Sequence, residues 1–133
     1  MVAHSTEISV PARLTELPCL LAAVDAWAAI VGIPPIAVQR IHFAVEELFT
    51  NTVDHGFRAE SDLPVTLALA ADGGGITLRY VDRAPPFDTS RVPDLAPEAE
   101  RIGGYGLKVV QTMASAFRYR FANGANETEI EFR

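Results

Sequence analysis

At 133 residues, 49% hydrophobic and 21% charged, the chain has the length and composition of one folded domain, which argues against disorder. Seventeen acidic residues against eleven basic ones give a formal net charge of −6, so we expect no direct nucleic-acid binding through phosphate neutralisation. Cys19 is the only cysteine, which excludes an internal disulfide and a zinc cluster held by thiolates. We expect one domain that covers residues 1–133.

The first half of the chain predicts one strand and two helices. "TEISVPA" alternates briefly and predicts a strand that ends at Pro11, and apolar residues from about Leu14 to Val31 follow at helical spacing. The apolar run is interrupted by Asp25 and lacks a basic leader, so we expect neither a signal peptide nor a membrane span, and a cytoplasmic protein. After the breaker "GIPP", a second helix should run to about His55, with Gly56 as its C-terminal stop.

The second half of the chain predicts two hairpins and a short helix. "PVTLALA" and "ITLRYVD" alternate on either side of "ADGGG", and "FRYRF" and "ETEIEF" alternate around an Asn123-Gly124 turn. Between the hairpins, a loop from Arg83 to Arg101 precedes a helix from Leu107 to about Ala116. These elements predict an α+β fold: a two-layer sandwich with a mostly antiparallel sheet and helices on one face.

The second helix carries an unusual polar stripe within "AVEELFTNTVDHGF". At about 100° per residue, Glu47, Asn51 and His55 lie beside the apolar face, whereas Glu46 points about 100° away from Glu47. One interpretation is a solvated outer face, with His55 close to the negative end of the helix dipole. The other is chemical, because a carboxylate and an amide oxygen one turn apart can bind Mg²⁺ beside phosphates, and the carboxylate can act as a general base.

Two further segments bear on that choice. In "VDRAPPFD", Asp82 ends a predicted strand, where its carboxylate can accept a hydrogen bond from an exocyclic amine or a buried water, or can form part of a simple turn. In "RIGGYGLKVV", three glycines open a helix, where backbone amides can approach phosphate oxygens or form an ordinary flexible loop. The chain contains neither a P-loop motif nor a G-x-S-x-G elbow.

Taken in order, these segments resemble the GHKL (Bergerat) ATP-binding fold, and more narrowly the anti-sigma-factor serine/threonine kinases of bacterial partner-switching systems. "EELFTNTVDHGF" is similar to the N-box of that family, "GGYGL" to its glycine box, and "DRAPPFD" to its first glycine box. The departure is Ala84, because the family pattern D-x-G-x-P-F has glycine there. If that backbone needs positive φ or lies against the base, the methyl group costs about 1 kcal/mol or more; a well-accommodated alanine fits the sequence equally well.

The resemblance implies roles for residues on the phosphate side of an ATP site. Asn51 would contact Mg²⁺ and the phosphates, and Glu47 would be the base for the attacking hydroxyl. Gly104 and Gly106 would line the phosphates, with Leu107 beside them in the glycine box.

The resemblance also implies roles on the base side. Asp82 would bind the adenine amine, Pro86 and Phe87 would form the pocket wall, and His55 would lie near the nucleotide. The segment Thr89–Ile102 would form a lid over ATP.

The implied activity is an anti-sigma regulatory kinase that binds ATP and Mg²⁺, phosphorylates a serine or threonine of an antagonist protein and sequesters a sigma factor. Family members often form a homodimer. Two alternatives stay open: a protein-binding module of the same fold with weak or no ATP binding, which Ala84 favours, and an ATPase that delivers phosphate to water. Autophosphorylation on histidine is disfavoured, because none of the three histidines sits in a separate helical phosphoacceptor segment.

Overall fold

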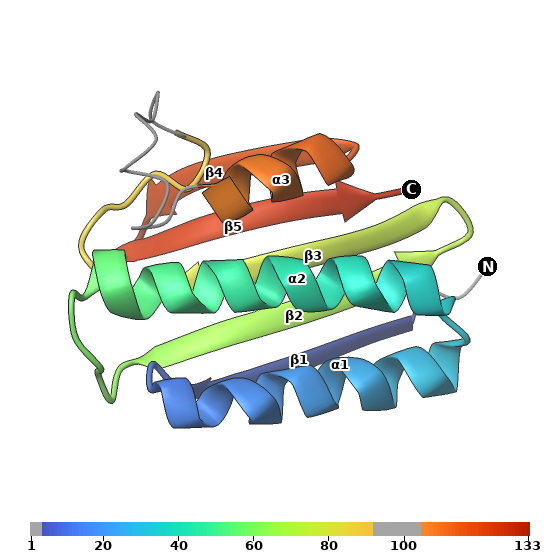
Figure 1. Ribbon diagram of the computed structural model, residues 1–133, viewed down its shortest axis with the longest axis horizontal. Helices are drawn as coiled ribbons and strands as arrows, with labels where there is room; N and C mark the ends of the chain where they lie inside the picture. Colours follow the sequence, from blue (N-terminus) through green and yellow to red (C-terminus); the bar gives the residue numbers. More distant parts are fainter. Residues whose placement is uncertain (1–3, 92–104) are drawn as a thin grey trace.

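The computed structural model describes residues 4–91 and 105–133, and its helices and strands form two layers (Figure 1). In chain order the elements are the strand β1 (His4–Pro11), a 3-10 turn (Leu14–Glu16), the helices α1 (Leu17–Val31) and α2 (Pro35–Asn51), a π-helical turn (Thr52–Gly56), the strands β2 (Pro64–Asp72) and β3 (Gly75–Asp82), the helix α3 (Tyr105–Met113), and the strands β4 (Ala116–Ala122) and β5 (Ala125–Phe132).

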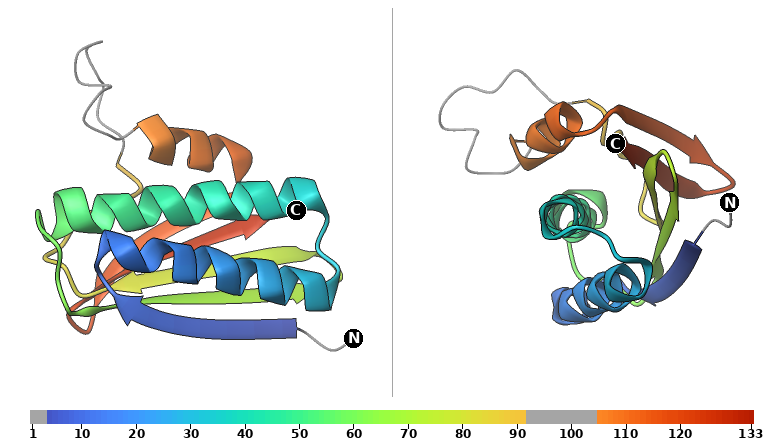
Figure 2. Two further views of the ribbon diagram at one scale, coloured as in Figure 1. Left: turned by 60° about the horizontal axis from the view of Figure 1, so that its bottom comes forward. Right: turned by 90° about the vertical axis from the view of Figure 1, so that its right-hand side faces the viewer.

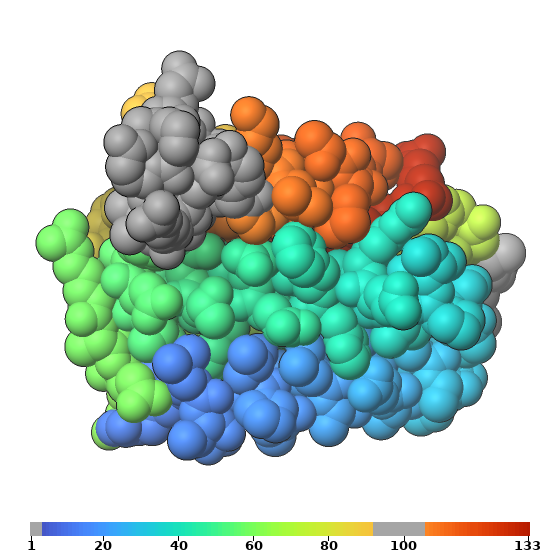
Figure 3. All heavy atoms as spheres, viewed as in Figure 1, coloured from blue at the N-terminus to red at the C-terminus, as the bar shows by residue number. Residues whose placement is uncertain are grey.

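Within the described residues, the strands form one sheet in the order β1-β2-β3-β5-β4, and every neighbouring pair is antiparallel. Among residues 4–91 and 105–133, the helices α1, α2 and α3 cover the same face, with α2 in the middle, and no helix covers the other face (Figures 1 and 2). In the space-filling view, the side chains of α1, α2 and α3 form three adjacent rows over the sheet (Figure 3). The predicted α+β sandwich with helices on one face is confirmed.

The core lies between α2 and the central strands. The apolar face predicted for α2 is the buried one, and Ile41, Val45, Leu48 and Phe49 are almost fully removed from solvent. On β2 and β3 every second residue points into this core, as the predicted alternation requires. The same alternation sends the intervening side chains to the open face of the sheet.

The helix α1 is more apolar than its position at the edge of the molecule requires. By length and composition alone, the 18-residue segment Leu14–Val31, with a mean hydropathy of 1.6, could cross a membrane. In the structure its inner side packs against β1 and α2. Leu20, Val24, Trp27 and Ala28 are the buried residues of α1.

The end of α2 differs from the prediction. Gly56 does not stop the helix in a left-handed conformation; instead α2 widens into a π-helical turn in which the Phe57 N–H bonds the Thr52 carbonyl at 2.8 Å, and the positive φ falls on Arg58 at 59°. Gly56 is under a different constraint, because a Cβ there would lie 3.0 Å from the Ala84 Cβ, which is closer than most Cβ contacts in proteins. Such π turns within helices are frequent at functional sites.

The other boundaries follow the predictions closely. The helix α3 begins at Tyr105 rather than Leu107 and ends at Met113, because the chain enters β4 at Ala116. The β4–β5 hairpin turns at Asn123 (φ 55°) and Gly124 (φ 73°), and two positive φ values in a two-residue loop define the type I′ turn that this dipeptide favours.

Candidate functional site

The polar stripe on α2 is oriented as its spacing predicts. Asn51 is 4% exposed, and its Nδ2 donates to the Glu47 carbonyl oxygen at 2.6 Å, one turn earlier. Glu47 and His55 are half-buried, whereas Glu46 is exposed. The two adjacent glutamates therefore occupy different environments, and Glu47 is the one turned toward the interior.

The Glu47 carboxylate lies directly against Gly106 in the first turn of α3. A Cβ added at Gly106 would fall 1.9 Å from Glu47 Oε2 and 2.1 Å from its Cδ, so no side chain fits between the two residues. Burial raises the pKa of Glu47, and the charge of Glu46 raises it further. The carboxylate thus lies at the positive end of a helix dipole and still holds its proton more tightly than an exposed glutamate.

Asp82 is 7% exposed at the end of β3, and three groups hydrogen-bond to it. Its Oδ2 accepts from Thr52 Oγ1 at 2.7 Å, and its Oδ1 accepts from Asn126 Nδ2 at 2.9 Å and from the Ala84 N–H at 3.1 Å. An ionised carboxylate has about four acceptor positions, so one remains, on Oδ2. Asp82 can therefore accept one more donor.

A buried tyrosine extends this network. The Tyr80 hydroxyl lies 2.6 Å from Thr52 Oγ1, and because Thr52 donates to Asp82, Tyr80 donates to Thr52. Burial raises the pKa of Tyr80 well above its usual value, which keeps the phenol protonated. Thr52 Oγ1 also lies 3.0 Å from the Leu48 carbonyl oxygen, so its single proton has two acceptors, of which Asp82 is the nearer, and Tyr80 is the donor to Thr52 in either case.

Ala84 is accommodated without backbone strain. It is absent from the residues with positive φ, and its methyl group is 1% exposed beside Gly56. Of the two costs considered for an alanine at this position, a left-handed backbone is therefore excluded. The space that the methyl group needs comes from Gly56 on the facing turn.

The ring of His55, in the π-helical turn, stacks on the ring of Phe87 with centroids 6.1 Å apart and an interplanar angle of 11°. The structure therefore brings together two of the residues assigned to the base side. Pro86, assigned to the same wall, is exposed. Leu107 is 2% exposed and belongs to the hydrophobic core. Gly104 and the lid residues from 92 to 102 lie outside the described residues.

Sequence reasoning missed several polar residues of this site, namely Thr52, Tyr80, Asn126 and Thr128. All four are buried and hydrogen-bonded, and Thr128 Oγ1 lies 2.6 Å from Thr89 Oγ1. A signal was present, because Asn126 and Thr128 alternate in phase with the core residues Ile130 and Phe132. Polar side chains at core-facing positions require partners inside the protein.

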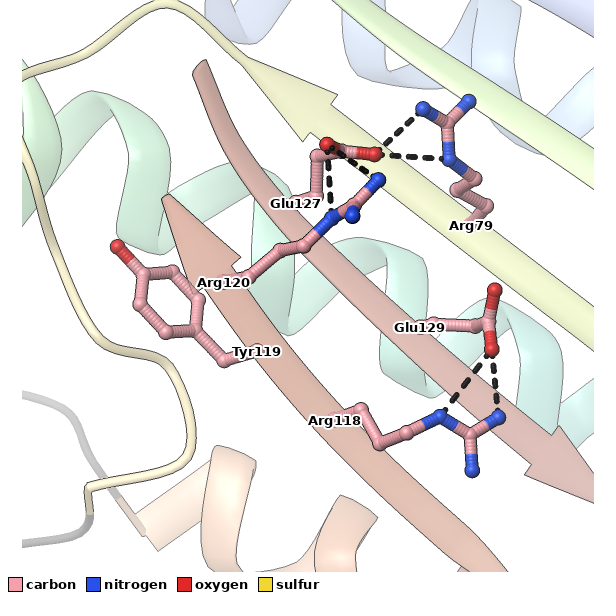
Figure 4. Close-up of a pocket in the computed structure, with 6 residues that line it drawn as sticks. All are labelled: Arg79, Arg118, Tyr119, Arg120, Glu127 and Glu129. Carbon is pink, nitrogen blue, oxygen red and sulfur yellow. Dashed lines mark hydrogen bonds and ion pairs between the residues drawn. The ribbon is translucent and has the colours of Figure 1, made fainter. Parts of the chain in front are cut away.

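The open face of the sheet carries a different polar cluster, around a concavity of about 550 Å³ (Figure 4). Here Arg79 and Arg120 both bind Glu127, and Arg118 binds Glu129. The guanidinium groups are thus neutralised by glutamates of β5. The residues that line this concavity are Arg79, Arg118, Tyr119, Arg120, Glu127 and Glu129.

The family comparison agrees with a site built from the polar end of α2, the Asp82 network and the start of α3. The family model described as "Histidine kinase-like ATPase domain" matches residues 10–133. The chain belongs to this family, which confirms the predicted GHKL resemblance.

Within this family, individual proteins of known name or structure are similar to the chain. Serine-protein kinase RsbW of Listeria monocytogenes serotype 4a is 27% identical over 111 residues, covering 71% of each chain, and RsbW of Listeria innocua serovar 6a matches equally well. Among solved structures, the RsbU and RsbW domains of Rv1364c from Mycobacterium tuberculosis match 97% of this chain at a TM-score of 0.70 and 21% identity. This chain spans about a third (32%) of that protein's length.

A second solved structure, the SiaB–SiaC complex from Pseudomonas aeruginosa, covers 96% of this chain and 88% of its own at a TM-score of 0.67 and 11% identity. At these identities the two structures show a shared fold. The relatives with the higher identity are named serine-protein kinases.

Proposed function

We propose that this protein binds Mg-ATP between α2, α3 and the end of β3, transfers the γ-phosphoryl group to a serine or threonine of an antagonist protein, and sequesters a sigma factor. The observation that carries the proposal is the contact of the Glu47 carboxylate with Gly106, one helical turn from the buried Asn51. The similarity to serine-protein kinases RsbW supports the kinase class. The likeness to one member of a two-protein complex supports a protein partner.

The base side of the proposed site is suited to adenine. The remaining acceptor position on Asp82 Oδ2 fits an exocyclic amine, which is a donor, and disfavours a carbonyl oxygen. The rings of His55 and Phe87, which stack on each other, would form a flat aromatic wall of the base pocket.

On the phosphate side, the residues present fit a magnesium–phosphate group. Asn51 Nδ2 is engaged by the Glu47 carbonyl, which leaves the amide oxygen as the atom that would serve a hard cation. The absence of a side chain at Gly106 permits close approach to the start of α3, where the helix dipole favours an anion. Mg-ATP, when bound, supplies the phosphoryl group and neutralises its charge.

Glu47 is placed to orient the acceptor hydroxyl and to take its proton. A base works best when its pKa approaches the working pH, and burial moves the pKa of Glu47 in that direction. Its neighbour Glu46 is exposed and has the same charge. Glu46 is therefore a matched control for any substitution at Glu47.

The test combines binding and transfer. Calorimetric titration with Mg-ATP should show saturable binding that Asn51→Ala and Asp82→Asn abolish, whereas Glu47→Gln should bind ATP and lose transfer to an antagonist domain from a partner-switching system. Glu46→Gln should retain both activities. Unchanged transfer in Glu47→Gln removes Glu47 from its role. Partner binding without any transfer by the wild type selects a protein-binding module instead, and phosphate release without an acceptor selects an ATPase.

A further inference from the structure

The segment after Asp82 has an unusual backbone. It reads Arg83-Ala84-Pro85-Pro86-Phe87, so two consecutive residues lack an N–H group. The only amides available between positions 84 and 87 are those of Ala84 and Phe87. A segment of this kind cannot stabilise its own conformation with local backbone hydrogen bonds and depends on partners from elsewhere.

That partner is Asn126, which lies directly opposite Asp82 in the β3–β5 register and is 4% exposed. Its Nδ2 donates to Asp82 Oδ1 at 2.9 Å and approaches the carbonyl oxygens of Ala84 at 3.0 Å and Pro85 at 3.1 Å. Its Oδ1 accepts from the Phe87 N–H at 2.9 Å. One side chain therefore bonds both the carboxylate and the segment that follows it.

The orientation of this amide is determined by its surroundings. Every group near Nδ2 is an acceptor, and the groups near Oδ1 are donors, since Oδ1 also accepts from the Tyr119 hydroxyl on β4. Figure 4 shows the Tyr119 hydroxyl pointing away from the arginines of the open face. A rotated amide would face its NH2 to the Phe87 N–H and its oxygen to the oxygens of Asp82, Ala84 and Pro85, so the observed orientation is the stable one.

We infer that Asn126 is a positioning residue that makes this site select a purine with a 6-amino group. With the Ala84 N–H, its Nδ2 fills both acceptor positions of Asp82 Oδ1, which leaves the single free position on Oδ2. The same side chain fixes the backbone at Phe87, whose ring stacks on His55. The inference rests on the proposed function, because it concerns how the proposed nucleotide site reads its base.

The test compares ATP with purine riboside triphosphate, which carries hydrogen in place of the 6-amino group. A hydrogen bond to a charged group is equivalent to a factor of about 10 to 100 in affinity, so wild-type protein should prefer ATP by about that ratio. Asn126→Ala should reduce the ratio to about 1 to 3, while affinity for the shared triphosphate is retained. Glu129→Gln, on the same strand but on the open face, should keep the wild-type ratio.

A second variant separates the two halves of the amide. Asn126→Asp keeps an acceptor for the Phe87 N–H but replaces the donor to Asp82 with a like-charged oxygen. Amide hydrogen exchange, measured without nucleotide, should therefore show the Phe87 N–H protected in Asn126→Asp and exchanging at least about tenfold faster in Asn126→Ala. Both variants should lose the preference for ATP.

These readouts distinguish the inference from the proposal beneath it. If wild-type protein does not bind Mg-ATP, the proposed function fails and base selection fails with it, while exchange at Phe87 still decides whether Asn126 holds the segment. If wild-type protein prefers ATP and both Asn126 variants keep the same ratio, the inference is wrong and the proposed function stands. Thermal unfolding of each variant checks that the changes in ratio belong to folded protein.

Discussion

Replacing Gly106 with alanine should displace the Glu47 carboxylate without unfolding the protein. The added Cβ would lie 1.9 Å from Glu47 Oε2 and 2.6 Å from its Cγ, so the Glu47 side chain must rotate away. Gly106 has no positive φ that an alanine would strain. Under the proposed function, a displaced base should lower phosphoryl transfer by about 10² or more.

The cost in stability follows from two opposed effects. Alanine stabilises a helix by up to about 1 kcal/mol relative to glycine, and overpacking costs about 1–3 kcal/mol, at the low end here because a half-buried glutamate can rotate. Gly106→Ala should therefore leave wild-type stability within about 1 kcal/mol. In a Glu47→Ala background the clash is gone, and the same change should stabilise by up to about 1 kcal/mol, or about 4 °C in Tm.

Urea unfolding of nucleotide-free wild type, both single variants and the double variant measures the coupling directly. Lys108→Ala, on the exposed side of α3, is the matched control and should show no coupling to Glu47→Ala. A Gly106→Ala effect that is the same in both backgrounds would refute the contact. The nucleotide-free measurement matters, because Gly106 also lies in the proposed phosphate site.

Three further predictions concern charge and packing. Burial and the charge of Glu46 raise the pKa of Glu47, so phosphoryl transfer should decline as pH falls through that pKa. Glu46→Gln should move the inflection of the pH–rate profile to lower pH, and an unmoved inflection would contradict the effect of Glu46 on Glu47. Two arginines lower the pKa of Glu127, so its carboxylate stabilises the fold fully above the ordinary glutamate pKa, and this stabilisation is lost as pH falls through the lowered pKa. Urea unfolding measured against pH should therefore show that Glu127→Gln loses less stability in acid than wild-type protein does. An equal loss in the two proteins would contradict the role of Glu127. A Cβ at Gly56 would lie 3.0 Å from the Ala84 Cβ, so Gly56→Ala should be more favourable by about 1 kcal/mol in an Ala84→Gly background than in wild-type protein. An equal effect in both backgrounds, measured by urea unfolding, would show that the two positions are not in contact.

The sequence was sufficient for features that depend on one element at a time. Helical spacing separates Glu47 from Glu46, and their different exposure follows from it. Strand alternation and the Asn123-Gly124 dipeptide predict the second hairpin and the position of its turn. Such features are local, because each is decided by residues within a few positions of one another.

Features that depend on two distant elements could not be predicted in this way. Asn126 faces Asp82 because β5 inserts between β3 and β4, and no local pattern contains that pairing across 44 positions. The sequence predicts Gly56 as a helix stop, since a glycine that lies close to Ala84 in the fold looks the same in one sequence. Both contacts depend on the tertiary structure, because the order of the strands and the π-helical turn after α2 decide which side chains meet.

The distribution of buried polar groups links stability to function in this fold. Seven polar or charged residues are buried in the described parts of the chain, and all lie at the end of α2 and its π turn, at the end of β3, at the start of β5 or in the segment after β3. Glu127 alone among them pairs with the arginines of the open face. A buried polar group costs about 1–3 kcal/mol when its partner is removed, so each of these residues depends on the others. The hydrogen bonds from Thr52, Asn126 and the Ala84 N–H meet at Asp82, so its loss would leave all three donors without their common acceptor. Substitutions there should reduce nucleotide binding and stability together, whereas Glu47, which is half-buried and lies against a glycine, is the position where activity can be removed while the fold is kept.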